Sequence, residues 1–60
     1  MKITVADAAK QLGLTPLTVR GLMQEGRLNI GYAIKHKNSS KWTYYIFEKL
    51  LEDEKKRLGL

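Results

Sequence analysis

Two helix signals stand so close together in this chain that they decide how it must turn. Gly13 predicts the left-handed end of one helix. Thr15 followed by Pro16 predicts the capped start of the next, which Gly26 ends. Only Gly13 and Leu14 lie between the first helix and the second cap. A link this short forces a sharp helix–turn–helix crossing rather than a long antiparallel pair.

The residues around this turn predict two short amphipathic helices. Thr4 and Asp7 have the spacing of a capping box, so the first helix should begin at residue 5 and run to about residue 12. Its inward side is predicted to hold Val5, Ala8, Ala9 and Leu12. The inward side of the second helix is predicted to hold Val19, Leu22 and Met23. Together these elements form a helix–turn–helix over about residues 4–26.

After the second helix the apolar period changes from helical to alternating, which predicts a β-hairpin. The first strand is expected to turn one face inward through Leu28, Ile30, Tyr32 and Ile34. The second strand is expected to do so through Trp42, Tyr44 and Ile46. The polar tip runs from His36 to Lys41, and Tyr45 should lie on the opposite, partly exposed face. The hairpin is predicted over about residues 28–46.

The remaining chain, about residues 47–58, is predicted to form a third helix that closes the core. Its apolar side should hold Phe47, Leu50, Leu51 and Leu58. Its acids are predicted to lie on a solvated face; they are Glu48, Glu52, Asp53 and Glu54. The order helix, turn, helix, hairpin, helix is the plan of a winged helix–turn–helix, so the expectation is one α+β domain spanning residues 1–60.

The charge is distributed unevenly along the chain. Residues 1–46 carry seven basic and two acidic side chains, whereas residues 47–60 carry four of each. From Gly26 to Ile46 there is no acid, but there are four basic residues. A one-sided positive field suggests a polyanionic partner such as nucleic acid, although small soluble proteins are often basic without one.

Several other classes of function find no support in the sequence. There is no Cys, and His36 is the only His, so neither a metal site nor another cofactor is expected. No nucleophile with its base and no phosphate-cradling loop is recognisable, so we expect no enzyme. No apolar stretch approaches the roughly 20 residues of a membrane span, and no secretory leader is evident. The expected location is the bacterial cytoplasm, in association with the nucleoid.

The outer face of the second helix carries the first group of candidate DNA-binding residues. A polar helix face of this length fits the major groove of DNA. The group comprises Thr15, Pro16, Leu17, Thr18, Arg20, Gly21 and Gln24. Arg20 could contact a guanine edge or a phosphate, while Thr15 has a second interpretation as a cap alone. Leu17 could touch a thymine methyl or pack on the hairpin, and Gly21 could admit DNA backbone or be a helix defect.

The hairpin carries the second group of candidates. Its lysines would reach phosphates or straddle the minor groove, and its short polar residues would shape the turn and donate to phosphates. The group comprises Arg27, Lys35, His36, Lys37, Asn38, Ser39, Ser40, Lys41 and Trp42. For Trp42, packing in the hairpin core competes with a role in stacking on bases.

The stretch TVADAAKQLGLTPLTVRGLMQEGRL, with SKWTYYI further on, resembles the winged helix–turn–helix of excisionase-type and MerR-like DNA-binding domains. The similarity lies in the order and spacing of Thr4, Ala9, Gly13, Thr15–Pro16, Thr18, Arg20 and Gly26–Leu28. MerR-like regulators usually have aromatic residues after the arginine that corresponds to Arg20, whereas Gly21 and Leu22 follow here. They also carry a long dimerisation helix, so a stand-alone binder of the excisionase kind is favoured.

The resemblance implies sequence-specific binding of double-stranded DNA. An excisionase, or recombination directionality factor, of a phage or mobile element binds cooperatively beside further copies of itself and bends DNA to direct an integrase. Two main alternatives stay open. One is a small transcriptional regulator with the same fold; the other is a protein-interaction module whose hairpin or last helix docks an integrase. A weaker option is binding of single-stranded nucleic acid, which would need Trp42, Tyr44 or Tyr45 exposed as stacking surfaces, and their alternation argues against it.

Overall fold

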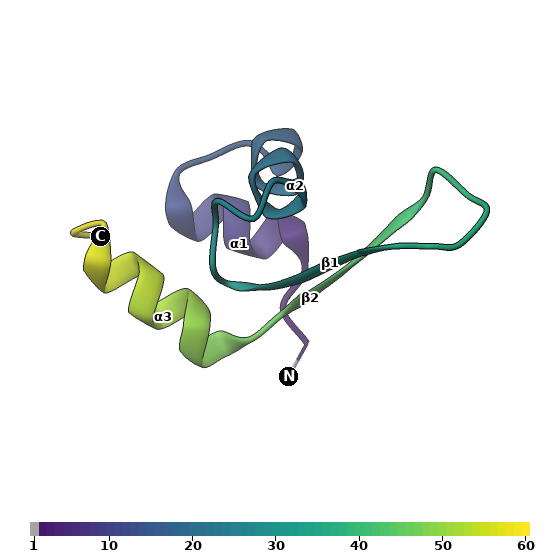
Figure 1. Cartoon of the computed structure of the whole chain (residues 1–60). Helices are drawn as coiled ribbons and strands as arrows, with labels where there is room; N and C mark the ends of the chain where they lie inside the picture. Colours follow the sequence, from purple (N-terminus) through teal and green to yellow (C-terminus); the bar gives the residue numbers. More distant parts are fainter. Residues whose placement is uncertain (1) are drawn as a thin grey trace.

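The computed structural model describes residues 2–60 and contains three helices and one two-stranded antiparallel sheet. In chain order they are α1 (Val5–Leu12), α2 (Pro16–Gln24), β1 (Gly31–Lys35), β2 (Trp42–Ile46) and α3 (Glu48–Arg57). The helices form a small body, and the hairpin projects far beyond it to one side (Figure 1). The molecule is therefore elongated, with extents of 38 × 22 × 17 Å. The α+β class expected from the sequence is confirmed.

The signals at both helix starts work as predicted. The Thr4 hydroxyl accepts from the Asp7 N–H at 3.1 Å, and the Asp7 carboxylate accepts from the Thr4 N–H at 3.2 Å. Gly13 ends α1 at φ +72°, a left-handed conformation that costs glycine little. Pro16 begins α2, and the chain between the helices is as short as the sequence requires. The two helices therefore cross sharply (Figure 1).

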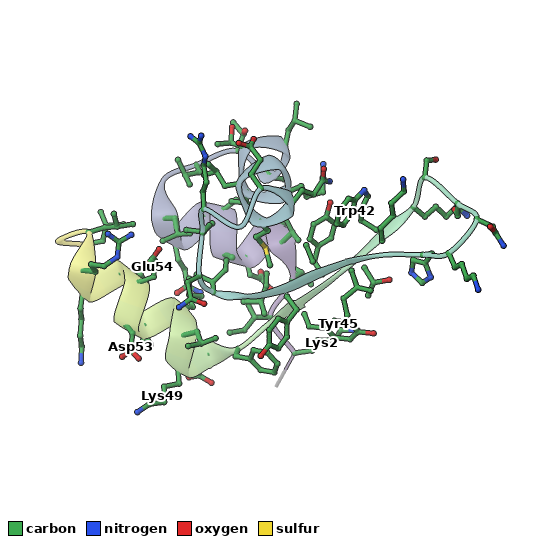
Figure 2. The ribbon with its side chains drawn as sticks, viewed as in Figure 1. Lys2, Trp42, Tyr45, Lys49, Asp53 and Glu54 are labelled. Carbon is green, nitrogen blue, oxygen red and sulfur yellow. The ribbon has the colours of Figure 1, made fainter. Side chains whose placement is uncertain are left out.

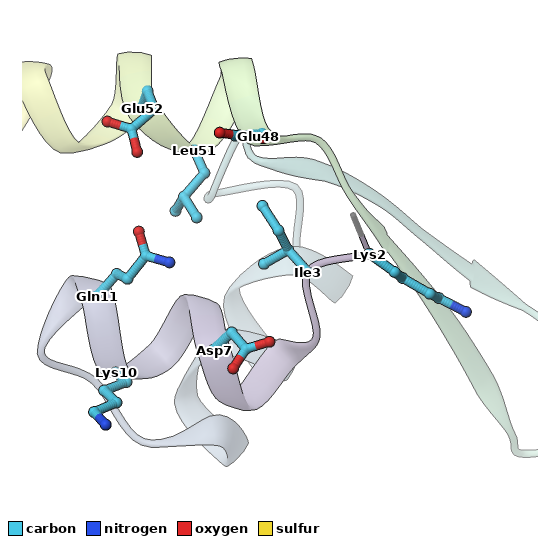
Figure 3. Close-up of a pocket in the computed structure, with 8 residues that line it drawn as sticks. All are labelled: Lys2, Ile3, Asp7, Lys10, Gln11, Glu48, Leu51 and Glu52. Atoms are coloured by element: carbon cyan, nitrogen blue, oxygen red, sulfur yellow. The ribbon is translucent and has the colours of Figure 1, made fainter.

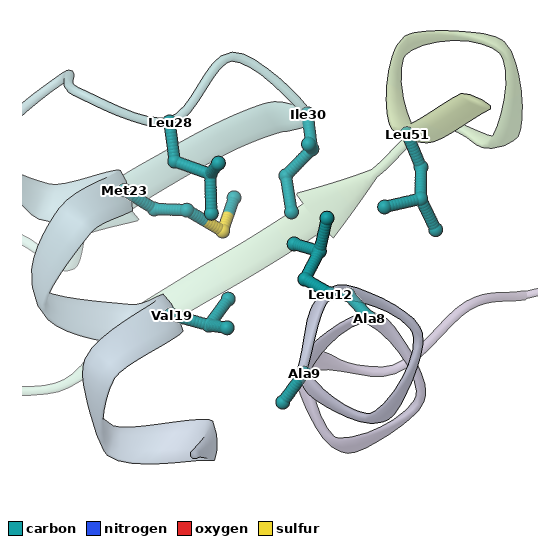
Figure 4. Packing of buried hydrophobic residues seen from close by; sticks show 8 residues of the cluster. All are labelled: Ala8, Ala9, Leu12, Val19, Met23, Leu28, Ile30 and Leu51. Atoms are coloured by element: carbon teal, nitrogen blue, oxygen red, sulfur yellow. The ribbon is translucent and has the colours of Figure 1, made fainter. Parts of the chain in front are cut away.

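The core lies where α1, α2 and the start of α3 meet the base of the hairpin. Three elements and the loop before β1 contribute its buried side chains (Figure 4). They are Ala8, Ala9, Leu12, Val19, Met23, Leu28, Ile30 and Leu51. Ala8 and Ala9 present no bulk, so the backbones of α1 and α2 can approach closely. Burial of this cluster is the main stabilising contribution in a domain of this size.

The first strand differs from its prediction in both extent and phase. Leu28 and Ile30 are buried as expected, but β1 begins only at Gly31, and Tyr32 and Ile34 face outward with 64% and 51% of their surface exposed. Gly31 lies where the phase changes; its φ is +158°, and a Cβ at this position would overlap the Tyr45 carbonyl. The inward face of β1 is therefore formed by Gly31, Ala33 and Lys35.

The last helix also corrects the sequence-based expectation. Phe47 caps α3 with its backbone only, and its ring is exposed on the outside of the hairpin; Leu58 is exposed as well. Glu54, expected in solvent, is buried at 6% exposure and binds Arg57 through two hydrogen bonds of 2.7 and 2.9 Å. Glu54 and Arg57 thus form a part-buried ion pair within the last turns of α3.

Candidate nucleic-acid interface

The outward face of α2 presents a stripe of three residues at helical spacing. Leu17 has 75% of its surface exposed, Gln24 is exposed and Gly21 is partly exposed. Leu17, Gly21 and Gln24 are spaced by four and three residues, so they lie along one line on the helix. Arg20 and Thr18 flank this line on opposite sides, Arg20 being half-buried and Thr18 exposed. No residue of this line packs into the core.

The first turn of α2 combines a structural and a surface role. The Thr15 hydroxyl accepts from the Thr18 N–H at 3.2 Å, which makes Thr15 the N-cap. The two threonine hydroxyls also bond to each other at 2.8 Å. Both threonine side chains remain exposed at the positively polarised start of the helix, and so does Pro16. The threonine hydroxyls therefore keep some capacity to hydrogen-bond a ligand.

One exposed hydrogen bond links α2 to the hairpin. Gln24 Nε2 donates to Tyr44 Oη at 2.6 Å. Cross-strand pairing puts Tyr44 opposite Ala33 and Trp42 opposite Lys35, so these four share the hairpin face that looks toward α2. Trp42 is half-buried and lies on this side of the ribbon (Figure 2). The sequence predicts Tyr44 in the hairpin core, with base stacking as the alternative; its hydrogen bond to α2 has no signal in the sequence.

The outward stripe of α2 and this hairpin face form one continuous surface, which we call the α2–hairpin surface. It comprises Leu17, Arg20, Gly21, Gln24, Lys35, Trp42 and Tyr44. An exposed helix and a projecting ribbon bound it on its two sides (Figure 1). Four candidates of the first group, Leu17, Arg20, Gly21 and Gln24, thus share one side of the molecule with Lys35 and Trp42 of the second group, although they come from separate elements.

The hairpin tip is a built turn with charged side chains directed into solvent. The His36 N–H donates to the Lys41 carbonyl at 2.9 Å, and the Lys41 N–H donates to Ser39 Oγ at 3.1 Å. Asn38 takes the left-handed conformation with φ +61°, which Asn tolerates better than most residues. Lys37 and Lys41 are exposed, and so are Asn38 and Ser40. The polar residues thus shape the tip, and its lysines remain available.

The basic side chains of α2, the hairpin and the loop between them differ in whether they form an ion pair. Within residues 2–60, Arg20, Lys35, Lys37 and Lys41 take part in no ion pair. Arg27 is different, because its Nε lies 3.3 Å from Glu25 Oε1 on an exposed part of the loop. Arg27 is thus partly neutralised and stands apart from the hairpin tip. The positive field is concentrated on the hairpin, whose residues 31–46 contain no acid.

His36 has a local structural role. Its Nε2 is hydrogen-bonded to Thr43 Oγ1 on the neighbouring strand. No group of three His, Asp or Glu side chains that could hold a metal ion occurs among the described residues 2–60. His36 is exposed at the base of the tip and can still present its other ring nitrogen to a ligand.

A cavity of about 400 Å³ lies away from this surface, between α1 and the start of α3 (Figure 3). Its apolar floor is formed by Ile3 and Leu51, and charged side chains of both signs surround it. Two of its polar groups already serve the fold, since Asp7 belongs to the capping box and Gln11 Oε1 accepts from Lys55 Nζ at 3.1 Å. The cavity offers no convergent set of free polar groups.

Comparison of the chain with protein-family models, curated proteins and solved structures gives no match. Among residues 2–60, none of the helices has the length and apolar character needed to cross a membrane. Function is therefore inferred from the charge and shape of the α2–hairpin surface.

Proposed function

We propose that this protein is a winged helix–turn–helix that binds double-stranded DNA without catalysing a reaction. In this proposal α2 enters the major groove, and the hairpin, as the wing, lies on the adjacent backbone or minor groove. One observation carries the proposal: the exposed stripe of α2 adjoins an acid-free hairpin whose lysines have no ion-pair partner among residues 2–60. A surface of this sign and shape matches a phosphate backbone beside a groove.

The two parts of the surface have different tasks in this proposal. Lys35, Lys37 and Lys41 contact phosphates, which supplies most of the affinity without sequence information. Arg20 and Gln24 contact base edges, because a guanidinium matches guanine and an amide matches adenine in the major groove. Gln24 is held by Tyr44 in the free protein, so it must exchange this bond or share it when it meets a base.

Within this class, we propose a phage or mobile-element excisionase that binds beside further copies of itself, bends DNA and directs an integrase. The proposal draws on the resemblance of the helix–turn–helix and second strand to excisionase-type domains. A small transcriptional regulator would use the same contacts. Either role requires the protein to be on DNA in the bacterial cytoplasm, and a module of this size needs more than one copy to select a long site.

A protein-interaction module is the second candidate, and one observation favours it. Four large apolar side chains are exposed on the outside of the hairpin, and such patches often mark partner surfaces. They are Tyr32, Ile34, Tyr45 and Phe47. An integrase would be the partner in the excisionase setting.

A salt titration on duplex DNA separates the two candidates. Three to five phosphate contacts predict that the logarithm of the association constant falls with the logarithm of salt at a slope of about −3 to −5, since each contact contributes about 0.9. Fluorescence anisotropy with a labelled duplex measures this slope. Absence of duplex binding even at low salt would overturn the DNA-binding proposal and leave the interaction module.

A further inference from the structure

The hairpin has a second face, which points away from α2 and exposes large apolar side chains to solvent. Cross-strand pairing sets Tyr32 directly opposite Tyr45, and Ile34 opposite Thr43. Tyr32 and Tyr45 are 64% and 48% exposed, and Phe47 is 46% exposed. We call Tyr32, Tyr45 and Phe47, together with Ile34, the outer aromatic face. It lies on the opposite side of the ribbon from the α2–hairpin surface.

The three rings are held in a defined arrangement. Tyr32 and Phe47 are 5.7 Å apart between ring centres and 82° apart in plane, an edge-to-face contact. The Phe47 N–H donates to the Ile30 carbonyl at 2.9 Å, which fixes the backbone that carries this ring. Tyr45 stands beside Tyr32 on the neighbouring strand, where paired residues lie about 5 Å apart. Two of the three rings thus support each other, and the third stands on the neighbouring strand.

The charge around this face is positive. Ile3 forms a bridge with Ile46, so the preceding residue, Lys2, lies on the same side as Phe47 and Tyr45. Figure 3 shows Lys2 extending along the hairpin, away from the other residues of the cavity. The lysines of the tip border the other end, and residues 31–46 contain no acid. A partner for this face should carry negative charge together with flat apolar groups.

We propose that the outer aromatic face binds single-stranded nucleic acid, with unpaired bases stacked on Tyr32 and Tyr45. Bases supply the flat apolar groups, and the phosphates between them supply the charge for Lys2 and the tip lysines. Exposed aromatic rings on a β-sheet are a physical means of holding two or three successive bases. The stacking rings lie on the opposite side of the hairpin from the α2–hairpin surface, so the two proposals differ in the residues that contact bases and share only the lysines of the tip.

The test uses labelled oligo-dT and oligo-U, which distinguish DNA from RNA strands, and measures anisotropy at low salt. Tyr32→Ala and Tyr45→Ala should each weaken binding by roughly 5- to 150-fold, because loss of one stacking ring removes one base contact. Tyr32→Phe and Tyr45→Phe keep the rings and should bind within about twofold of the original. Both tyrosines are exposed, and circular dichroism verifies that each variant is folded.

Arg20→Ala is the matched control from the other surface. It should reduce duplex binding and leave oligo-dT and oligo-U binding unchanged, so failure of this inference and failure of the proposed function give different results. Two binding results overturn the inference, and a third result, from sedimentation, does so as well. The binding results are that the original protein binds neither oligonucleotide, or that the alanine variants bind as well as the original. If sedimentation instead shows self-association that Tyr32→Ala and Tyr45→Ala abolish, the face is an interface between copies and the inference is wrong.

Discussion

Arg20 is the residue on which selectivity depends in the proposed complex. It is half-buried beside the exposed stripe of α2 and forms no ion pair among residues 2–60, so its guanidinium can reach a groove without first breaking a salt bridge. A guanidinium can hold a guanine edge with two parallel hydrogen bonds or clamp one phosphate. These two uses differ in what they do to sequence preference.

Arg20→Ala should weaken binding to the preferred DNA site by about 1–3 kcal/mol, because only that site offers the base contact. The difference in affinity between the preferred site and random duplex should therefore become smaller. Competition binding with specific and random duplexes measures both affinities. An equal loss on both would show that Arg20 clamps a phosphate. The matched control is Leu17→Ala on the same helix, which removes no charge and should leave binding to random duplex unchanged.

Gly31 is the residue on which the geometry of the hairpin depends. A Cβ at this position would overlap the Tyr45 carbonyl, which belongs to the paired strand and cannot move independently. Gly31→Ala should therefore destabilise the fold by at least about 2 kcal/mol, a large share of the roughly 3–5 kcal/mol available to so small a domain. Urea unfolding measures this destabilisation. Gly21→Ala is the control, since its Cβ meets nothing within 4 Å, and helix propensity should make it neutral or slightly stabilising.

At the scale of elements, the sequence predicts helices better than it predicts the faces of strands. The predicted bounds of α1 and the predicted start of α2 are confirmed, because the caps, Gly13 and Pro16 act locally and are recognisable in the sequence. The predicted extent of β2 is confirmed as well. The predicted phase of β1 is wrong, since alternation continues through Gly31 in the sequence but not in space. The exposure of Tyr32 and Ile34 is missed for the same reason, whereas the predicted exposure of Tyr45 is confirmed. The candidate DNA-binding residues can be named from the sequence, whereas the Gln24–Tyr44 link that orients them depends on tertiary packing.

The hairpin as an element should determine the salt dependence of duplex binding. Replacing Lys35, Lys37 and Lys41 with Ala should weaken binding to all duplexes similarly and make the salt slope shallower by about 0.9 for each phosphate that is no longer bound. Anisotropy titrations at several salt concentrations give the slope. A control with Lys55 and Lys56 replaced, in α3 and away from the hairpin, should keep it. An unchanged slope in the hairpin variant would remove the hairpin from the interface.

The hydrogen-bonded carboxylates Glu54 and Asp7 should make the free energy of unfolding depend on pH. Hydrogen bonds from Arg57 lower the pKa of Glu54 below its ordinary value of 4.5, and the capping bonds from Thr4 lower the pKa of Asp7 below 3.8. A carboxyl with a lowered folded pKa stabilises the fold fully above its unfolded pKa and loses this contribution as pH falls through the folded pKa. Stability should therefore decline from about pH 5 downward.

Glu54→Gln tests the contribution of the Glu54–Arg57 pair. It should cost about 1–2 kcal/mol at neutral pH, because the charged hydrogen bonds are lost while Arg57 stays largely solvated. The variant should also show a smaller drop in stability between neutral and acid pH than the original protein, as measured by urea unfolding across the range. Glu52→Gln, whose exposed carboxylate pairs with the partly covered Lys55, is the control and should behave as the original. If Glu54→Gln and the original protein lose stability equally at acid pH, the pH dependence does not come from Glu54, and Asp7 is the next carboxyl to test.

At the scale of the whole molecule, the dimensions limit how copies can share one duplex. The longest extent is 38 Å, close to the 34–36 Å of one turn of B-DNA. If the hairpin projects along the duplex, neighbours on the same side need about one turn each, and closer spacing would make them overlap. Selection of bound duplexes from a random pool should therefore recover motifs repeated at about 10–11 base pairs or at multiples of this spacing. Recovery of single isolated motifs would show that one copy suffices, and repeats markedly closer than one turn would require a different orientation of the hairpin on DNA.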